Sequence, residues 1–203
     1  MMLWYTARGA GLAALVLLSL STCLGALVSR QPAEARATLA GGRYLVQYLH
    51  RTLAGLGLVV LFVHVGTIVA DSYAHVRLTG AIIPFASGYR SGWVALGTIA
   101  AYLLVGVAIH GLARGRLASS ARGARTWRGV HLLAYAGWVA AVVHGLDAGS
   151  DIGVGWVRLI FIACVTAVVA SVTVRLGGVL QRAPSATAKP AARPVPSRIG
   201  VPR

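Results

Sequence analysis

Residues 48–70 read YLHRTLAGLGLVVLFVHVGTIVA, an apolar segment with one histidine near its start and another near its end, His50 and His64. A bilayer core about 30 Å thick requires about 20 mainly apolar residues in a helix. This segment has that length, and its one charged residue, Arg51, lies near its start. It therefore predicts a transmembrane helix. Because ionisable side chains are costly inside a membrane, the two histidines indicate a functional role.

The rest of the chain has the same character. Of its 203 residues, 57% are hydrophobic and 11% are charged, and the mean hydropathy is +0.75. A soluble domain carries about 25% charged residues. Further segments long enough to span a bilayer lie at about 9–29, 92–113, 127–147 and 154–175. We therefore predict an all-α integral membrane bundle of about five transmembrane helices within residues 1–182, with the first span retained because it is too long for a cleavable signal peptide.

The net charge of +15 is a topology signal. Arginines are concentrated in the first and third connections and after the fifth span, whereas the fourth connection has none. By the positive-inside rule, the N-terminus is expected outside and the C-terminus in the cytoplasm of a bacterial-type cytoplasmic membrane. A nucleic-acid partner is not expected, since the charge lies at span ends. Residues 183–203, rich in proline and basic residues, predict a disordered cytoplasmic tail.

The histidine spacing suggests a cofactor. His50 and His64 are 14 residues apart in the second span, and His131 and His144 are 13 apart in the fourth. The predicted topology makes these spans parallel, so His50 pairs in depth with His131 near the inner face, and His64 with His144 nearer the outer face. At about 1.5 Å per residue, the two levels lie about 20 Å apart. Each pair could supply both axial ligands of a b-type haem.

Helix geometry supports this arrangement only in part. At about 100° per residue, a spacing of 14 returns to within about 40° of the same face, but a spacing of 13 leaves the second ring about 140° away. Two explanations stay open: the fourth helix is distorted near Gly137, or the two haems approach it from different sides. His75 and His110 have no partner at either depth and are left out of the haem set.

Three arginines could neutralise haem propionates. Arg51 and Arg128 lie near the inner pair of histidines, and Arg90, or alternatively Arg77, lies on the outer side. Interfacial anchoring explains each of them equally well.

Several motifs resemble the ferric reductase-like transmembrane family, which includes the NADPH oxidases and the haem subunit of bacterial periplasmic methionine-sulfoxide reductase systems. The resemblance covers about residues 45–175, and the histidine spacings of 14 and 13 are its most specific part. The motifs are LHR (49–51), VHVGT (63–67), ADSY (70–73), PFASGYR (84–90), WRGVHLLAY (127–135) and HG (144–145).

The resemblance implies an inner haem on His50 and His131, an outer haem on His64 and His144, and a workable 13-residue spacing. It also implies that electrons pass from reduced flavin in the cytoplasm through both haems to an acceptor outside. That acceptor would be ferric iron, oxygen or a periplasmic enzyme.

The chain departs from the family pattern in two respects. Larger members open with an additional helix that is not visible here. Oxidoreductase members also carry a flavin and nicotinamide domain after the last span, where this sequence has a short proline-rich tail and no G-x-G-x-x-G. No FAD or NADPH site is therefore expected, and electrons would come from a separate cytoplasmic flavin reductase. Whether the chain is itself an enzyme stays open.

Two other functions use the same histidines. In a structural or anchoring membrane subunit, they would form hydrogen bonds between helices. In a metal or proton transporter they would line a path, which predicts carboxylates within the spans. Asp71, Asp147 and Asp151 instead lie at span ends.

Overall fold

The computed structural model describes residues 2–28, 40–72, 75–117, 119–149 and 151–180. Regular secondary structure in these ranges is entirely α-helical, and five helical segments are long and apolar enough to cross a membrane. The prediction of an all-α bundle with five spans is confirmed. The predicted tail, 183–203, lies outside the described residues, as do Arg30 and Arg36 of the first connection. The spans are α1 (Met2–Val28), α3 (Ala40–Ala70), α5 (Ser91–Leu112), α7 with α8 (Ala121–His131 and Leu133–Ala148), and α9 (Gly155–Leu180).

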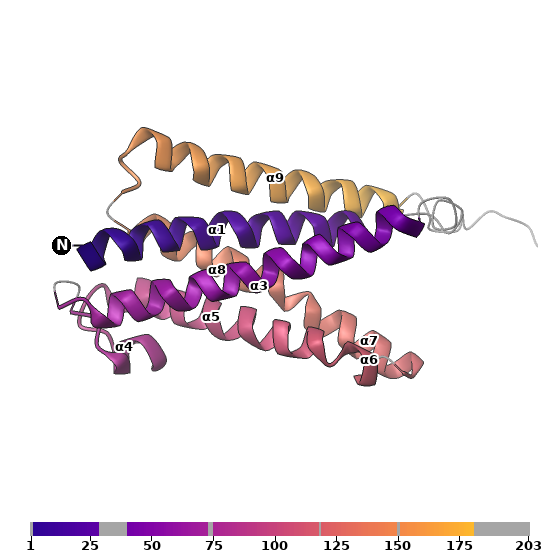
Figure 1. The fold of residues 1–203 in the computed structure, drawn as a ribbon, viewed down its shortest axis with the longest axis horizontal. Coiled ribbons are helices and arrows are strands. Elements are labelled where there is room, and N and C mark those ends of the chain that lie inside the picture. The colour runs from indigo at the N-terminus through magenta and orange to yellow at the C-terminus, as the bar shows by residue number, and fades with distance from the viewer. Residues whose placement is uncertain (1, 29–39, 73–74, 118, 150, 181–203) are drawn as a thin grey trace, which may run out of the picture.

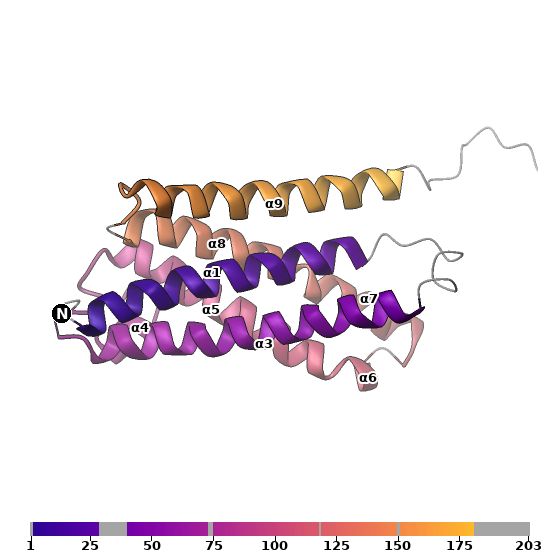
Figure 2. The ribbon, with the colours of Figure 1, turned by 45° about the horizontal axis from the view of Figure 1, so that its top comes forward.

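The helices run up and down along one axis (Figures 1 and 2). Helix α1 packs most extensively against α3 and also against α9, while α5 packs against α8. Helices α3 and α8 run in the same direction, from the end of the bundle where α7 lies toward the end where α1 begins (Figure 1). Two short helices lie at opposite ends: α4 (Leu78–Ile82) between α3 and α5, and α6 (Arg114–Leu117) between α5 and α7.

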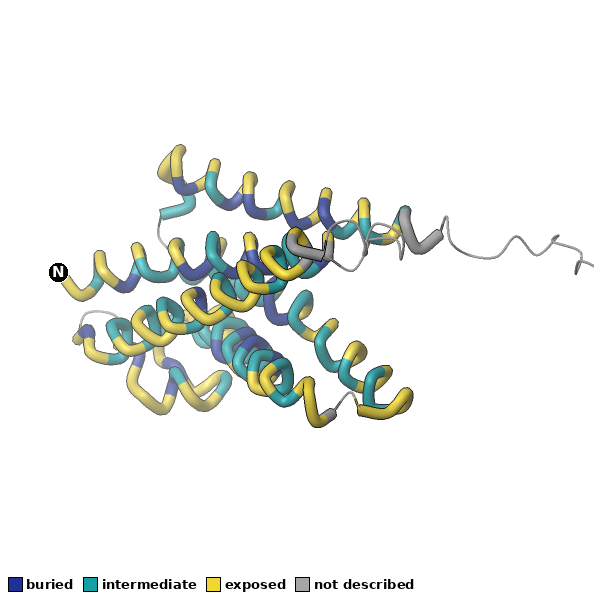
Figure 3. The backbone as a smooth tube through the Cα atoms, turned by 45° about the vertical axis from the view of Figure 1, so that its right-hand side comes forward, coloured by how far each residue is buried: buried dark blue, intermediate teal, exposed yellow. Residues whose placement is uncertain are grey.

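Side-chain burial follows the pattern expected of a bundle in lipid. Among the described residues, the largest buried cluster joins α1, α8 and α9 through Leu15, Trp138, Val157 and Phe161. Many large apolar residues are exposed, among them Phe62 at 60%. Exposed positions recur along the outward sides of the helices (Figure 3). In water, so much exposed apolar surface would be unfavourable, whereas a bilayer accommodates it.

The fourth span is interrupted at Leu132, between α7 and α8. The backbone N–H of Leu132 is shared between the carbonyls of Gly129 at 3.1 Å and Arg128 at 3.2 Å, and that of Tyr135 donates to the carbonyl of Leu132 at 3.0 Å. Such i→i−3 bonds overwind a helix to about three residues per turn, which recovers part of the rotation that a 13-residue spacing lacks. Of the two explanations left open for the 13-residue spacing, a distorted fourth helix agrees with this break, but the break lies at Leu132 and not near Gly137. Gly137 itself lies within α8, against Leu103 and Leu104 of α5.

Candidate functional site

Four histidines of α3, α7 and α8 face one another in two pairs. The ring centroids of His50 and His131 are 6.1 Å apart, with an angle of 71° between their planes. Those of His64 and His144 are 6.4 Å apart, with an angle of 77°. The structure thus brings together the two pairs that the sequence placed at matched depths.

The helices that carry these pairs do not pack closely against each other. Within the described parts of the chain, α3 makes its main helix contacts with α1, and α8 makes its main contacts with α5. The paired rings therefore reach toward each other across a gap between α3 and the α7–α8 span. No hydrogen bond joins the two rings of either pair among the described residues; the hydrogen bonds of His50, His64 and His144 go to carbonyls of α1 and α5 instead.

The ring separations fit a metal bound from both sides. Two axial iron–nitrogen bonds of about 2 Å, with about 1 Å more from each nitrogen to its ring centre, give about 6 Å between centroids. Each imidazole can rotate about its own metal–nitrogen bond without breaking that bond. The angles of 71° and 77° between the ring planes are therefore compatible with ligation from both sides. The described residues contain no group of three or more His, Cys, Asp or Glu side chains that could hold a metal ion. Two protein ligands suit a metal that carries its own equatorial ligands, as haem iron does, better than a structural zinc ion, which takes four.

Hydrogen bonds fix the protonation of three of the four imidazoles. The Nδ1–H of His64 donates to the carbonyl of Ala7 at 2.7 Å, and that of His144 donates to the carbonyl of Trp93 at 2.7 Å. His50 Nδ1–H donates to the carbonyl of Ser21 at 2.8 Å and also lies 3.0 Å from Ser21 Oγ. Because a carbonyl only accepts, Nδ1 carries the hydrogen and Nε2 keeps a lone pair. In this tautomer Nε2 can ligate a metal, and metal-binding histidines commonly donate their other ring N–H to a carbonyl in the same way.

Glycines one helical turn beyond these carbonyls make room for the rings. A Cβ added to Gly11 would lie 3.0 Å from the ring of His64, one at Gly25 would lie 3.1 Å from His50, and one at Gly97 would lie 2.7 Å from His144. Each glycine follows its carbonyl residue by four positions and so lies on the same helix face. The three supports are Ala7 with Gly11, Ser21 with Gly25, and Trp93 with Gly97.

Sequence reasoning missed these supports, although α1 contained a signal. The two α1 supports are 14 residues apart, which is the separation of His50 and His64 on the antiparallel helix α3.

His131 has a different environment. Among the described residues its buried Nδ1 has no hydrogen-bond partner, and its ring stacks on Trp127 with centroids 4.9 Å apart and planes 16° apart. The guanidinium of Arg114 lies 5.1 Å from the centre of the Trp127 ring. His110, in the last turn of α5, also has a buried Nε2 without a partner. His75 is exposed and lies in the connection between α3 and α4.

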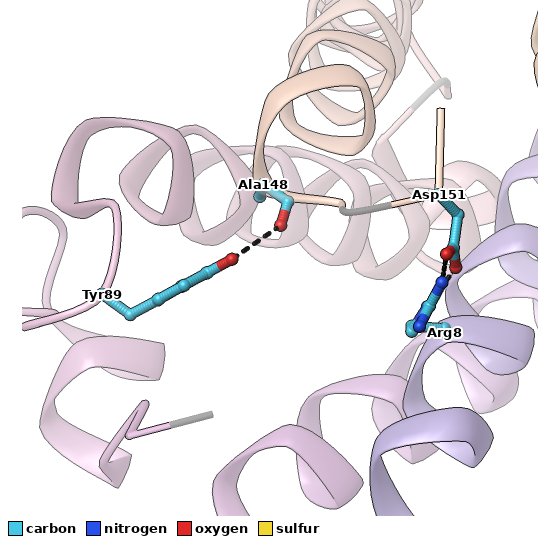
Figure 4. Close-up of polar contacts among 4 residues, drawn as sticks. All are labelled: Arg8, Tyr89, Ala148 and Asp151. Atoms are coloured by element: carbon cyan, nitrogen blue, oxygen red, sulfur yellow. Dashed lines mark hydrogen bonds and ion pairs between the residues drawn. The ribbon is translucent and has the colours of Figure 1, made fainter. Parts of the chain in front are cut away.

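The His64–His144 pair lines a cavity whose wall is largely apolar and comes from every span. Arg8, Tyr89 and Asp151 also line this cavity, at the end of the bundle where α1 begins. The guanidinium of Arg8 forms an ion pair with the carboxylate of Asp151 (Figure 4). The Tyr89 hydroxyl donates to the carbonyl of Ala148 at 3.5 Å. This cavity therefore has a single arginine among its lining residues, and sequence reasoning did not select it.

None of the three arginines selected from the sequence lines this cavity, although only Arg90 was expected on its side, and Arg51 and Arg128 were assigned to the inner pair. Arg51, Arg90 and Arg128 are exposed. Arg90 donates a hydrogen bond to the carbonyl of Asp147 and is not part of the cavity wall. Arg8 was missed because the predicted first span began at residue 9, whereas α1 begins at Met2.

Comparison of the chain with family models, with curated proteins and with solved structures finds no match.

Proposed function

We propose that this protein is a membrane electron-transfer subunit that holds two b-type haems, one between His50 and His131 and one between His64 and His144. The observation that carries the proposal is the facing of two histidine pairs at 6.1 and 6.4 Å. That separation fits a metal bound on both sides, and it recurs at two levels of the same gap.

Electrons would enter at the His50–His131 level and leave at the His64–His144 level. The side with α6 and α7 is rich in arginine. At the opposite end, Asp71 follows α3, Asp147 lies in the last turn of α8, and Asp151 follows α8. Applied to this distribution, the positive-inside rule places α6 and α7 in the cytoplasm and the N-terminus outside, in a bacterial-type cytoplasmic membrane. The donor would be a separate cytoplasmic flavin reductase, and the acceptor would be ferric iron, oxygen or a periplasmic enzyme.

The residues of the chain would each have a defined part. When bound, haem supplies a one-electron couple whose potential depends on its ligands and surroundings. The four histidines bind and orient it, and the carbonyls of Ala7, Ser21 and Trp93 hold three of them in the ligating tautomer. Apolar side chains of the cavity exclude water, and Arg8 offers a positive charge to a carboxylate.

The experiment is purification of the full chain from cells supplied with haem. The protein should be red, bind about two haems per chain, and show a Soret band that shifts on reduction with dithionite. His50→Ala and His131→Ala should remove one spectral component, and His64→Ala and His144→Ala the other. His75→Ala is the matched control and should keep both. A colourless protein that takes up no added haemin would end the proposal, and loss of the same component in His50→Ala and His64→Ala would disprove the pairing.

A further inference from the structure

The end of the bundle at α6 and α7 combines positive charge with an aromatic stack. We propose, on the basis of the proposed function, that this end is where an acidic electron-donor protein docks and that Trp127 carries the electron path from it to His131. We define the α6–α7 basic surface by its five arginines: Arg114, Arg116, Arg122, Arg125 and Arg128.

The charge of this surface is uncompensated within its own helices. All five arginines are exposed. The chain has four carboxylates in total, and none lies between residues 72 and 146. A positive field of this kind accelerates association with a negatively charged partner and selects it over neutral ones. The chemistry of the surface therefore fits a protein whose redox group is surrounded by acidic residues.

Aromatic groups lead inward from this surface. Arg114 lies over the face of Trp127 at 5.1 Å, and Trp127 stacks on His131 at 4.9 Å. His131 in turn faces His50 at 6.1 Å. Because electron tunnelling weakens steeply with distance and with gaps in packing, a continuous stack from an exposed arginine to a ligand histidine is a favourable path. The buried Nε1–H of Trp127 has no hydrogen-bond partner in the part of the chain that the structure describes, so no hydrogen bond from that atom to those residues accounts for its position.

Anionic lipid headgroups are the competing occupant. Arginines at span ends commonly contact them. They would not require a stacked Trp–His pair under the arginines, and that stack favours a redox protein.

The transfer step is simple in its balance. One electron leaves the reduced donor, which is oxidised by one electron, and reduces ferric iron held by His50 and His131 to ferrous iron. No bond forms or breaks on this chain, and any proton that the donor releases stays on the donor side.

The test measures haem reduction after rapid mixing with a reduced flavodoxin of acidic isoelectric point, using the full chain in nanodiscs of zwitterionic lipid. Arg122→Glu with Arg125→Glu reverses two charges on the basic surface. Arg77→Glu with Arg158→Glu makes the same charge change at exposed positions nearer the opposite end. At low ionic strength, the first double variant should lower the second-order rate constant by about tenfold or more, and the difference should vanish at high salt. The control pair should stay near the wild-type rate.

Trp127 is tested separately at saturating flavodoxin. Trp127→Leu should slow reduction severalfold, whereas Trp127→Phe, which keeps an aromatic ring, should recover most of the rate. Reduction by dithionite, a small reagent that needs no docking, should be unchanged in every variant, which guards against misfolding. Haem content is measured first.

Three outcomes would overturn the proposal. Equal rate constants for haem reduction by flavodoxin in the two double variants would show that the donor does not dock on this surface. A rate that follows the anionic lipid content of the nanodisc rather than the charge of the donor would assign the arginines to lipid. Equal rates for Trp127→Leu and wild type would remove the path. Absence of haem from the wild-type chain would instead refute the proposed function.

Discussion

Gly97 of α5 lies against the imidazole of His144, so closely that an added Cβ would be 2.7 Å from both Nδ1 and Cε1 of that ring. The same ring donates from Nδ1 to the carbonyl of Trp93, one turn earlier in α5. Helix α5 therefore fixes the His144 ring by a hydrogen bond from Nδ1 and makes room for that ring at Gly97.

Gly97→Ala should displace the His144 ring, because a Cβ at 2.7 Å requires the ring to move away from Trp93. We expect haem content to fall by about half, with loss of the component that His144→Ala also removes. Pyridine haemochrome assay and redox titration of the purified protein measure this. Gly106→Ala in the same helix is the control, since its Cβ meets nothing within 4 Å. Two retained haems in Gly97→Ala would show that the ring tolerates the methyl group.

Ser21→Ala should keep both haems and raise the midpoint potential of one. The hydroxyl contacts His50 Nδ1 at 3.0 Å, and its removal leaves the Ser21 carbonyl as the remaining acceptor. A weaker acceptor makes the imidazole a poorer electron donor, which destabilises the ferric state. One neutral hydrogen bond contributes about 0.5–1.5 kcal/mol, or about 20–60 mV for one electron. Thr22→Ala, at a neighbouring hydroxyl bonded to the carbonyl of Leu18, should leave both potentials unchanged.

Arg8→Gln should weaken haem retention at the His64–His144 level more than Asp151→Asn does. If the only role of Arg8 were its ion pair with Asp151, the two variants would lose haem at the same rate. Both side chains are partly exposed, so the pair itself adds at most about 1 kcal/mol to stability. Transfer of haem to apomyoglobin measures retention, and we expect severalfold faster loss in Arg8→Gln. Arg90→Gln should match wild type, because Arg90 lies outside the cavity wall.

Ser19→Ala should destabilise the bundle. Ser19 Oγ accepts the indole N–H of Trp138 at 2.8 Å, and both residues are buried. Loss of the hydroxyl leaves the indole N–H unsatisfied, at a cost of about 1–3 kcal/mol. Thermal unfolding in detergent measures the change. Ser171→Ala removes the hydroxyl of another buried serine, 9% exposed against 3% for Ser19, whose bond to Ala167 lies within its own helix, and it should cost less. Equal losses in the two variants would contradict the special role of the Ser19–Trp138 bond.

Much of the fold could be predicted because lipid imposes a simple rule. A helix that crosses a bilayer must be about 20 residues long and apolar, so α3, α5 and α9 were evident from composition. The pairing of His50 with His131 also followed from counting, since parallel helices with similar spacings place side chains at similar depths.

The support of the site could not be predicted in the same way. The acceptors at Ala7 and Trp93 are backbone carbonyls, which any residue type supplies, so no residue identity marks them. The helix is interrupted at Leu132, where the sequence has neither proline nor glycine, so residue type does not predict the interruption. Whether Arg8 or Arg90 lines the cavity depends on where α1 begins and on how the connection before α5 folds. Hydropathy does not reveal either.

The supports on α1 have a practical consequence for anyone who expresses this protein. Residues 2–28 carry the acceptors of His50 and His64 and the glycines against which both rings lie, so they should not be replaced by a fusion tag. A version truncated before α3 would retain all four histidines and still lack two of the three supports described for their rings. The purified truncated protein should therefore contain little haem. That low haem content would reflect the missing helix rather than an unsuitable set of ligands.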